Sequence, residues 1–452
     1  MPSLLVKHGT LVTASDWMDR TDQDILIVDG VIRTIGTGLD PLDSDTQIID
    51  ATGCYLFPGG IDPHVHMALP IGNGLVSSDD FESGTRAALA GGTTTLIDFI
   101  TPVRGQSLLA AAEERMRLAR RSRCHCRFHM SVTSWHRRIP SEMRTLKERD
   151  GICSVKVYMA YKQTIGLNDR EILKVMDAAA KLDLLVMVHG EHGETIDYLQ
   201  HQFISEGKRQ PEFHAGSRPP EVEGEAVQRA IMMARAAGCS LYIVHVSTQD
   251  AVLEIERARG RGLPVYAETC PHYLLLDEAE YRRPGFEGAA YVVSPPLRSQ
   301  KHRDALWDAV GSGVIQVVST DHCPFNMKGQ KDRGIHDFTQ IPNGAAGVQH
   351  RLELLYRYGV LENKISLRRF VELTSEQPAR IFKLYPQKGT LAPGADADIV
   401  VWDPEIRDTI SARTHLHRCD TSIYEGFSVK GKARDVILRG KEFLKKDNID
   451  IE

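Results

Sequence analysis

Residues 154–190 read SVKVYMAYKQTIGLNDREILKVMDAAAKLDLLVMVHG, in which two short apolar runs flank a longer amphipathic segment. The runs 154–159 and 184–190 have the length and the β-branched content of buried strands. Between them, residues 168–183 place apolar side chains at helical spacing and acidic side chains in the first turn. This order predicts a strand, a crossover helix and a second, parallel strand.

The same alternation extends through the middle of the chain. Strand candidates occur at 59–66, 93–99, 127–133, 154–159, 184–190, 240–246, 264–270 and 314–321. Helix-like segments lie between them at 168–183, 225–238, 249–262 and 302–313. Eight strands alternating with helices predict an α/β fold of the (β/α)8 TIM-like barrel type. A doubly wound open sheet is the alternative, but no glycine-rich phosphate motif follows the first strand.

Both ends of the chain show a different sequence pattern from the middle. Short apolar alternations broken by glycine and aspartate occupy 3–12, 24–36 and 46–58, and they recur at 394–404 and 427–444. We therefore expect a small β-sandwich domain formed by both termini. The predicted domains are 1–57 and 385–452 for the sandwich, and 58–384 for the barrel.

Composition narrows the class of protein. A net charge of -5 over 452 residues gives no electrostatic reason to expect nucleic acid or a membrane surface as partner. No apolar run approaches the roughly 18 residues of a membrane span, and the first residues lack the apolar core of a signal peptide. The eight cysteines are too few for a disulfide scaffold in a chain of this length. We expect a cytoplasmic protein with reduced cysteines.

Polar side chains recur where the predicted barrel strands end. Alternation along the first strand puts His64 and His66 on one face, which suits a shared metal ion. Each residue alone is more often structural than a ligand, but their convergence on one rim of a barrel predicts a metal site. The candidate ligands are His64, His66, Lys156, His189, His245 and Asp321.

Lys156 requires its own explanation, because a protonated amine cannot bind a cation. Reaction of its nitrogen with carbon dioxide gives a carbamate (N6-carboxylysine), whose two oxygens can bridge two cations. Four imidazoles, one carbamate and one carboxylate suit two divalent metal ions, with zinc expected and manganese, cobalt or nickel as alternatives.

Motifs along most of the chain then resemble a known family. They are FPGGIDPHVHM (57–67), SVKVYMAYK (154–162), MVHGE (187–191), YIVHVS (242–247), ETCPHYLLLD (268–277), VVSPPLR (292–298), STDHCPF (319–325) and IPNG (341–344). In this order they resemble the dihydropyrimidinase and D-hydantoinase group of the cyclic amidohydrolases, within the amidohydrolase superfamily. The β-rich termini match the accessory domain of that family.

The resemblance implies a role for each ligand. His64, His66 and Asp321 would hold the first metal ion, His189 and His245 the second, and carboxylated Lys156 would bridge both. A hydroxide shared by the metals would attack a ring carbonyl carbon. Asp321 would take its proton and pass it to the departing ring nitrogen.

Three further residues are implied to contact the substrate. The hydroxyl of Tyr161 would stabilise the oxyanion, and main-chain groups of Ser294 and Asn343 would hold the cyclic amide or imide. The expected reaction opens 5,6-dihydropyrimidines or 5-substituted hydantoins to N-carbamoyl amino acids. The resemblance also implies a homo-oligomer, a dimer or a tetramer.

The sequence departs from the family in two places and leaves alternatives open. Residues 67–78, MALPIGNGLVSS, lack the acidic residue usual in hydantoinases, which puts the choice of ring substituent in doubt. His192 stands where relatives often have asparagine, and we expect it to be no ligand.

Allantoinase or another cyclic amidohydrolase such as dihydroorotase is the nearest alternative function, and a non-enzymatic scaffold related to dihydropyrimidinase is a second one. Retention of all six ligands favours the enzyme.

Overall fold

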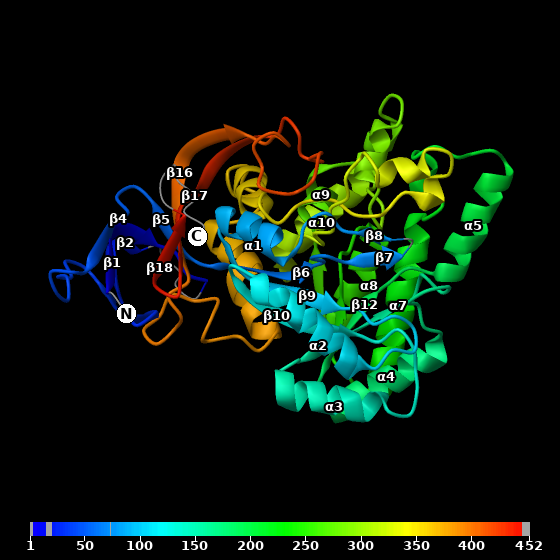
Figure 1. The fold of residues 1–452 in the computed structure, drawn as a ribbon, viewed down its shortest axis with the longest axis horizontal. Helices are drawn as coiled ribbons and strands as arrows, with labels where there is room; N and C mark the ends of the chain where they lie inside the picture. The colour runs from blue at the N-terminus through cyan, green and yellow to red at the C-terminus, as the bar shows by residue number, and fades with distance from the viewer. Residues whose placement is uncertain (1–2, 15–19, 73, 445–452) are drawn as a thin grey trace.

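A computed structural model describes residues 3–14, 20–72 and 74–444 of the chain. It has two parts, a barrel surrounded by helices and a separate sheet that joins both ends of the chain (Figure 1). Asn73, within the loop that departs from the family, and the last eight residues lie outside the described part.

The barrel is a parallel sheet in which each strand pairs with the next along the chain. Its order is β6-β9-β10-β11-β12-β13-β14-β15. The strands are β6 (Gly60–Val65), β9 (Thr93–Ile100), β10 (His125–Ser131), β11 (Ser154–Tyr158), β12 (Leu185–His189), β13 (Leu241–Ile243), β14 (Val265–Thr269) and β15 (Val317–Val318). All eight overlap the strand candidates, and the predicted fold class is confirmed.

Helices cover the outside of the barrel (Figure 1). The longer ones are α1 (Phe81–Ala90), α2 (Leu108–Leu118), α3 (Ile139–Asp150), α4 (Asp169–Lys181), α5 (Gly193–Ser205), α7 (Pro220–Ala237), α8 (Gln249–Gly260) and α10 (Gln300–Ser312). The shorter ones are η1 (Ala119–Arg121), α6 (Phe213–Gly216), α9 (Pro271–Leu275), η2 (Glu278–Arg282), η3 (Glu287–Tyr291), η4 (Lys331–Gly334), η5 (Phe338–Gln340), α11 (Arg351–Leu355), η6 (Tyr356–Val360), α12 (Leu367–Val371), η7 (Glu372–Glu376) and α13 (Gln377–Ile381).

Helix α4 shows why these segments fold as they do. The Asn168 side chain accepts from the Glu171 amide, and the Glu171 carboxylate accepts from the Asn168 amide, which forms a capping box. Ile172, Val175 and Met176 recur at helical spacing and are buried against the barrel. The helix therefore returns the chain to the start of β12, and both flanking strands end at the same rim.

The barrel closes between β6 and β15 mainly through side chains. One parallel bridge joins Val65 to His322, beyond the end of β15. Buried Arg351 donates from Nη1 to the carbonyl oxygens of Ile61, at 2.9 Å, and Val318, at 3.0 Å. The guanidinium thus takes the place of ladder hydrogen bonds that two-residue β15 is too short to make.

The second sheet combines strands from both termini. Its order is β18-β17-β16-β5-β1-β2-β3, and β4 pairs with β1. The strands are β1 (Leu4–Leu11), β2 (Arg20–Val28), β3 (Val31–Gly36), β4 (Gln47–Asp50), β5 (Tyr55–Pro58), β16 (Ile399–Thr409), β17 (Ser428–Leu438) and β18 (Lys441–Leu444). Antiparallel pairing of β5 with β16 joins the two ends, and side chains from both form one buried core. The predicted domain limits themselves stay a proposal.

Two local features differ from, or add to, the sequence expectation. Strands β13 and β15 are shorter than predicted, so His245 and Asp321 lie in the turns that follow them. The loop after His66 contains a small exposed hairpin, formed by β7 (Pro70–Gly72) and β8 (Leu75–Val76).

Within the described ranges, no helix combines the length and apolarity needed to cross a bilayer.

Candidate metal centre

The six predicted ligands meet at the carboxyl-terminal rim of the barrel. They are His64 from β6, His66 directly after it, Lys156 from β11, His189 from β12, His245 after β13 and Asp321 after β15. All are buried except Asp321, whose side chain is partly exposed. Parallel strands in a barrel end on one side, so residues far apart in sequence share one pocket.

Asp321 lies between His64 and His66. Its Oδ1 is 3.1 Å from His64 Nε2 and 3.1 Å from His66 Nε2. His64 Nδ1 donates to Glu268, so a neutral His64 has only a lone pair on Nε2. That lone pair and the carboxylate repel each other unless a positive charge lies between them. Ligand atoms of these three residues lie within 4.8 Å of one another, close enough to hold a cation.

The electrostatics of this group favour a positive charge. Burial and Lys156 lower the pKa of His64, but Glu268 and Asp321 outweigh them and raise it. Burial lowers the pKa of His66 to about 3, so that ring is neutral at pH 7. Burial raises the pKa of Asp321, but the two histidines outweigh burial and hold it well below its ordinary value. An ionised carboxylate beside imidazole lone pairs is a donor set for a divalent cation.

Lys156 is buried beside the first group. Its Nζ donates to His64 Nε2 at 3.0 Å and lies 4.0 Å from the centre of the Phe99 ring. Burial lowers the pKa of Lys156 to about 8, against the attraction of Asp321 and Glu268. A substantial fraction of its amine is therefore neutral near pH 8, the form that can react with carbon dioxide.

His189 and His245 form the second group of ligands. His189 Nδ1 is 2.9 Å from His245 Nε2. His189 Nε2 donates to Glu191 at 2.8 Å, and Arg218 donates to the same carboxylate oxygen at 2.6 Å. Burial raises the pKa of Glu191, but Arg218 and His189 outweigh burial and lower it. Because His189 donates from Nε2 to the charged Glu191, its lone pair is on Nδ1. Nδ1 is therefore the nitrogen that can bind a cation.

Two carboxylates that orient the ligands were missed by the sequence analysis. Glu268 accepts from His64 and from the Tyr242 hydroxyl, the latter at 2.8 Å, and Glu191 accepts from His189. A signal was present, because Glu268 is an acidic residue inside the apolar strand β14, and Glu191 follows β12 by two residues. A fully buried carboxylate needs a hydrogen-bonding or cationic partner.

Backbone strain accompanies the sharp turns at the rim. Tyr161 (φ 56°), His245 (φ 41°) and Asp321 (φ 49°) all adopt the left-handed region, which is costly for residues other than glycine. All three belong to the predicted site. Three of the eleven described non-glycine residues with positive φ thus belong to the predicted site, and backbone strain of this kind is often found at functional sites.

Tyr161 lies beside the second group of ligands, His189 and His245. The segment of Ser294 lies beside Tyr161, and the segment of Asn343 is joined to that of Ser294. The Tyr161 ring centre is 5.1 Å from that of His189. Burial raises the pKa of the Tyr161 phenol, while Arg218 opposes that rise, so the hydroxyl keeps its proton at pH 7. Buried Ser294 faces the same phenol, and a hydrogen bond of 2.9 Å from the Gly344 amide to the Val292 carbonyl joins the segment of Ser294 to that of Asn343.

Other residues singled out from the sequence have separate roles. His192 caps α5, where its Nδ1 accepts from the Thr195 amide at 3.2 Å. Burial raises the pKa of the Cys323 thiol, which makes it a poor nucleophile.

The residues at the rim fit a pair of divalent cations. Nδ1 of His66 and Nδ1 of His245 are buried without a partner among the described residues, and the opposite nitrogen of each ring faces the other ligands. Glu268 and Glu191 leave inward lone pairs on His64 and His189, and the inward nitrogens of His66 and His245 lie beside them around one lysine and one carboxylate. This donor set matches cations that prefer nitrogen and oxygen ligands.

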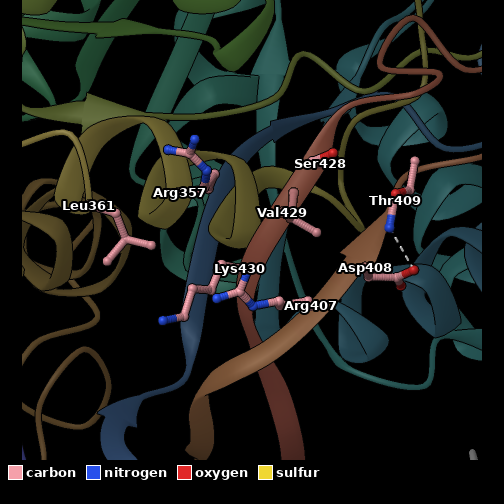
Figure 2. Close-up of a pocket in the computed structure, with 8 residues that line it drawn as sticks. All are labelled: Arg357, Leu361, Arg407, Asp408, Thr409, Ser428, Val429 and Lys430. Carbon is pink, nitrogen blue, oxygen red and sulfur yellow. Dashed lines mark hydrogen bonds between the residues drawn. The ribbon is translucent and has the colours of Figure 1, made fainter.

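A pocket on the terminal sheet is a separate feature. It has a volume of about 730 Å³ and lies beside β16 and β17 (Figure 2). Three of its charged side chains have partners, since Lys430 pairs with Glu405 at 3.0 Å, Arg357 with Glu362 at 3.0 Å and Asp408 with Lys432 at 2.6 Å. None of the predicted site residues lines it.

Comparison with known proteins gives consistent matches. The amidohydrolase family profile matches residues 55–443. The D-hydantoinase of Geobacillus stearothermophilus is 45% identical over 444 residues, which cover 98% of this chain and 93% of that protein. The dihydropyrimidinase of Arabidopsis thaliana is 40% identical, over 97% of this chain and 81% of the other. The crystal structure of dihydropyrimidinase from Brevibacillus agri superimposes with a TM-score of 0.96 at 43% identity, covering 99% of this chain and 96% of that one.

Proposed function

Because this chain belongs to the amidohydrolase family, within the group of D-hydantoinases and dihydropyrimidinases, we propose that it hydrolyses a small cyclic amide. The substrates would be 5,6-dihydropyrimidines or 5-substituted hydantoins, opened to N-carbamoyl amino acids. The observation that carries this proposal is the meeting of four histidines, one lysine and one aspartate at one rim of the barrel.

The proposed ligands are divided between two cations. His64, His66 and Asp321 would hold one, and His189 and His245 the other. When bound, two divalent cations lower the pKa of water and polarise a carbonyl group. Zinc suits this donor set best, with manganese, cobalt or nickel as alternatives.

Lys156 would join the two groups as a carbamate. Its neutral amine forms a bond to the carbon of carbon dioxide and loses one proton, which leaves an anionic group with two oxygens. The place of Lys156 supports this step, because its Nζ lies 3.0 Å from a ligand nitrogen of His64 and is buried. An uncompensated ammonium among metal ligands would repel cations.

Asp321 is placed to move the proton that ring opening requires. Attack of water on the ring carbonyl carbon releases a proton, and breaking the C–N bond requires one at the departing nitrogen. The Asp321 carboxylate lies at the rim and is partly exposed, whereas the histidine side chains beside it are buried. It can therefore reach both the attacking water and the substrate.

The remaining contacts orient the ring. The protonated Tyr161 phenol would donate to the carbonyl oxygen as negative charge develops. Main-chain groups of Ser294 and Asn343 would hold the amide or imide edge. Met67, Ala68 and Leu69 follow the first histidine pair and provide no cation for a substrate carboxylate, which favours a neutral ring over dihydroorotate.

The β7–β8 hairpin is the part of the site that departs from relatives, and we propose that it selects the ring substituent. Ile71 and Val76 on this hairpin are 42% and 43% exposed, so it presents apolar surface. Allantoin and other cyclic amides remain alternatives. A dimer or tetramer and a cytoplasmic location remain predictions, the former tested by light scattering of the purified chain.

The decisive experiment measures ring opening by purified protein supplied with zinc or manganese and bicarbonate. The panel is dihydrouracil, 5-substituted hydantoins, allantoin and dihydroorotate, with Lys156→Ala as control. Turnover of either of the first two, lost in the control, supports the proposal. No turnover of any substrate by fully metallated protein would refute the substrate class and favour the scaffold alternative.

A further inference from the structure

Three histidines outside the metal centre gather where the C-terminal part of the chain meets the barrel. His350 precedes α11, and His415 and His417 lie in the loop between β16 and β17. One ligand atom from each lies within 4.8 Å of the others. The ring centres are 5.0 Å apart for His415 and His417, and 5.7 Å apart for His350 and His417. We call these residues the three-histidine cluster.

Two of these rings have one nitrogen committed to an oxygen acceptor. His350 Nδ1 donates to Glu353 at 2.6 Å, and His415 Nε2 donates to the carbonyl oxygen of Cys419 at 2.8 Å. A neutral imidazole has one N–H and one lone pair. His350 therefore keeps its lone pair on Nε2, and His415 keeps its own on Nδ1.

The third ring is oriented by Asp79. His417 Nδ1 lies 3.3 Å from Asp79 Oδ2, and the side chains of both residues are fully buried. His322 Nε2 lies 3.2 Å from the same oxygen, while His322 Nδ1 accepts from the Gly347 amide at 3.1 Å. His322 therefore carries its proton on Nε2 and faces Asp79 as a donor, so it is not a ligand. Neither nitrogen of His417 forms a hydrogen bond with a described residue; a proton on Nδ1 would face Asp79 and leave the lone pair on Nε2.

The three remaining nitrogens have no protein partner. His350 Nε2, His415 Nδ1 and His417 Nε2 are all buried and form no hydrogen bond with any described residue. Leaving buried polar atoms unpaired is costly. Three such lone pairs in one place require a shared positive ion or donor.

Another cluster of the same kind shows how the protein resolves this problem elsewhere. His125, Asp396 and Asp398 also place ligand atoms within 4.8 Å of one another. There Lys388 Nζ lies 2.8 Å from Asp396 and 2.6 Å from Asp398, so an ammonium supplies the positive charge. Among the described residues, no lysine or arginine is recorded in a hydrogen bond or ion pair with a ring nitrogen of the three-histidine cluster.

We propose that His350, His415 and His417 bind a further divalent transition-metal ion, outside the centre at the barrel rim. Three neutral imidazoles, with a fourth position open to water, suit zinc. Glu353 and Asp79 behind two of the rings are the carboxylate partners that metal-bound histidines usually have. This inference does not depend on the proposed ring-opening activity.

The bound ion would hold the loop between β16 and β17 against the barrel. Residues 410–427 connect β16 with β17, and direct contacts already join this loop to the barrel, among them hydrogen bonds from the Leu416 amide to Gln349 at 2.7 Å and from the Arg418 amide to Asp79 at 2.9 Å, and the ion pair of Arg418 with Asp80 at 2.8 Å. The metal ion would add ligands from both sides, His350 from the barrel and His415 and His417 from the loop. Its role would be structural.

Metal content provides the first test. The full-length chain is loaded with zinc, freed of excess by gel filtration and analysed for zinc per chain. We expect the double variant His350→Gln/His417→Gln to hold one zinc ion fewer than the unsubstituted chain. His201→Gln, which alters an exposed histidine on α5, should hold the same number as the unsubstituted chain. Equal zinc content in the double variant and the unsubstituted chain would overturn the proposal.

A second test separates this site from the barrel rim. In Lys156→Ala, which disrupts the rim centre, zinc should still raise the melting temperature by about 2–5 °C. Adding His417→Gln to that variant should abolish the rise, and circular dichroism without zinc shows whether both variants are folded. Folded Lys156→Ala protein whose melting temperature is insensitive to zinc would refute the site, whatever the result of the activity assay.

Discussion

At the scale of the residue, the nitrogen that each histidine turns to a cation is selected by the contact at its other nitrogen. Glu268 holds Nδ1 of His64, and Glu191 holds Nε2 of His189. Because a neutral ring has one lone pair, His64 is left with Nε2 and His189 with Nδ1. Carboxylates that lie behind the ligands therefore decide how the rim can bind metal.

Replacing Glu268 by glutamine keeps the size of the side chain but removes the charge that orients His64. We expect metal affinity to fall about 10–100-fold, the usual cost of losing such a partner. Competition with a chelator measures the change. Glu256→Gln, on the exposed face of α8, is the matched control. Unchanged affinity in Glu268→Gln would show that His64 is oriented by other contacts.

Replacing Tyr161 by phenylalanine removes the proposed oxyanion donor and keeps the ring. We expect kcat to fall about 10²–10³-fold, with a much smaller change in KM, because the hydrogen bond strengthens only as charge develops. Steady-state kinetics separate the two constants. Tyr198→Phe, at a residue that is 68% exposed, should leave both unchanged. A purely structural role for Tyr161 would instead appear as a lower melting temperature.

The lowered pKa of Lys156, about 8, predicts how carbamate formation depends on pH. The reactive neutral amine is the form above the pKa, so its fraction rises about tenfold per pH unit below 8 and levels off above it. At constant carbon dioxide pressure, metal-free protein should therefore regain activity faster at pH 8 than at pH 7. The rate of reactivation with zinc measures this. A rate that is flat between these values would contradict a lysine-limited step.

At the scale of the element, the seam between β6 and β15 is where the barrel depends on a single side chain. Arg351 reaches it from the start of α11 and hydrogen-bonds to a carbonyl of each strand, and it also opposes the burial that raises the pKa of Asp62. Asp62 in turn accepts from the Thr320 amide, at 3.2 Å, and from its hydroxyl, at 2.6 Å. Asp321 directly follows Thr320, so the seam positions the proposed proton-transfer residue.

Removing the guanidinium should weaken both the seam and the site. We expect Arg351→Met to lower the free energy of unfolding by about 3–5 kcal/mol, because it leaves a buried aspartate without its cation. Urea unfolding followed by circular dichroism measures the loss. Arg368→Met, at an exposed position on α12, is the control. Equal stability of the two variants would show that the seam closes without Arg351.

At the scale of the whole molecule, the chain passes between the terminal sheet and the barrel twice, once before the barrel strands and once after them. The terminal sheet holds the N-terminal strands against β16 through β5, and the loop between β16 and β17 returns to the barrel beside α1 (Figure 1). Metal ions at the rim and at the three-histidine cluster would each link segments distant in sequence. Ligands that bind only the folded state stabilise it by mass action.

Metal removal should therefore destabilise the whole chain. Zinc at 1,000 times its dissociation constant stabilises a protein by about 4 kcal/mol per site, so dialysis against a chelator should lower the melting temperature and added zinc should restore it. Differential scanning calorimetry measures both changes. In Lys156→Ala the zinc-dependent part should be smaller, because only the three-histidine cluster remains intact. A melting temperature independent of zinc in the unsubstituted chain would contradict both sites.

The sequence by itself determined the order of the barrel strands, the pairing of the two termini and the six residues at the rim. These follow from local patterns, because alternation and helical spacing locate strand ends, and parallel strands of a barrel end together. His245 and Asp321 lie at the rim even though β13 and β15 are shorter than predicted. The residues at the rim were found together, but their roles stay predictions until tested.

Only the tertiary structure decided what lies behind and beside those residues. Glu268 contacts His64 across the barrel, Arg351 closes the seam, and His350 meets His417 from another part of the chain. The spacing of apolar residues within one strand or helix cannot predict these contacts, because each contact joins elements that are distant in sequence. The physical reason is burial: inside the protein each charge and each lone pair needs a specific partner, and only the packed fold determines which group is near enough to be that partner.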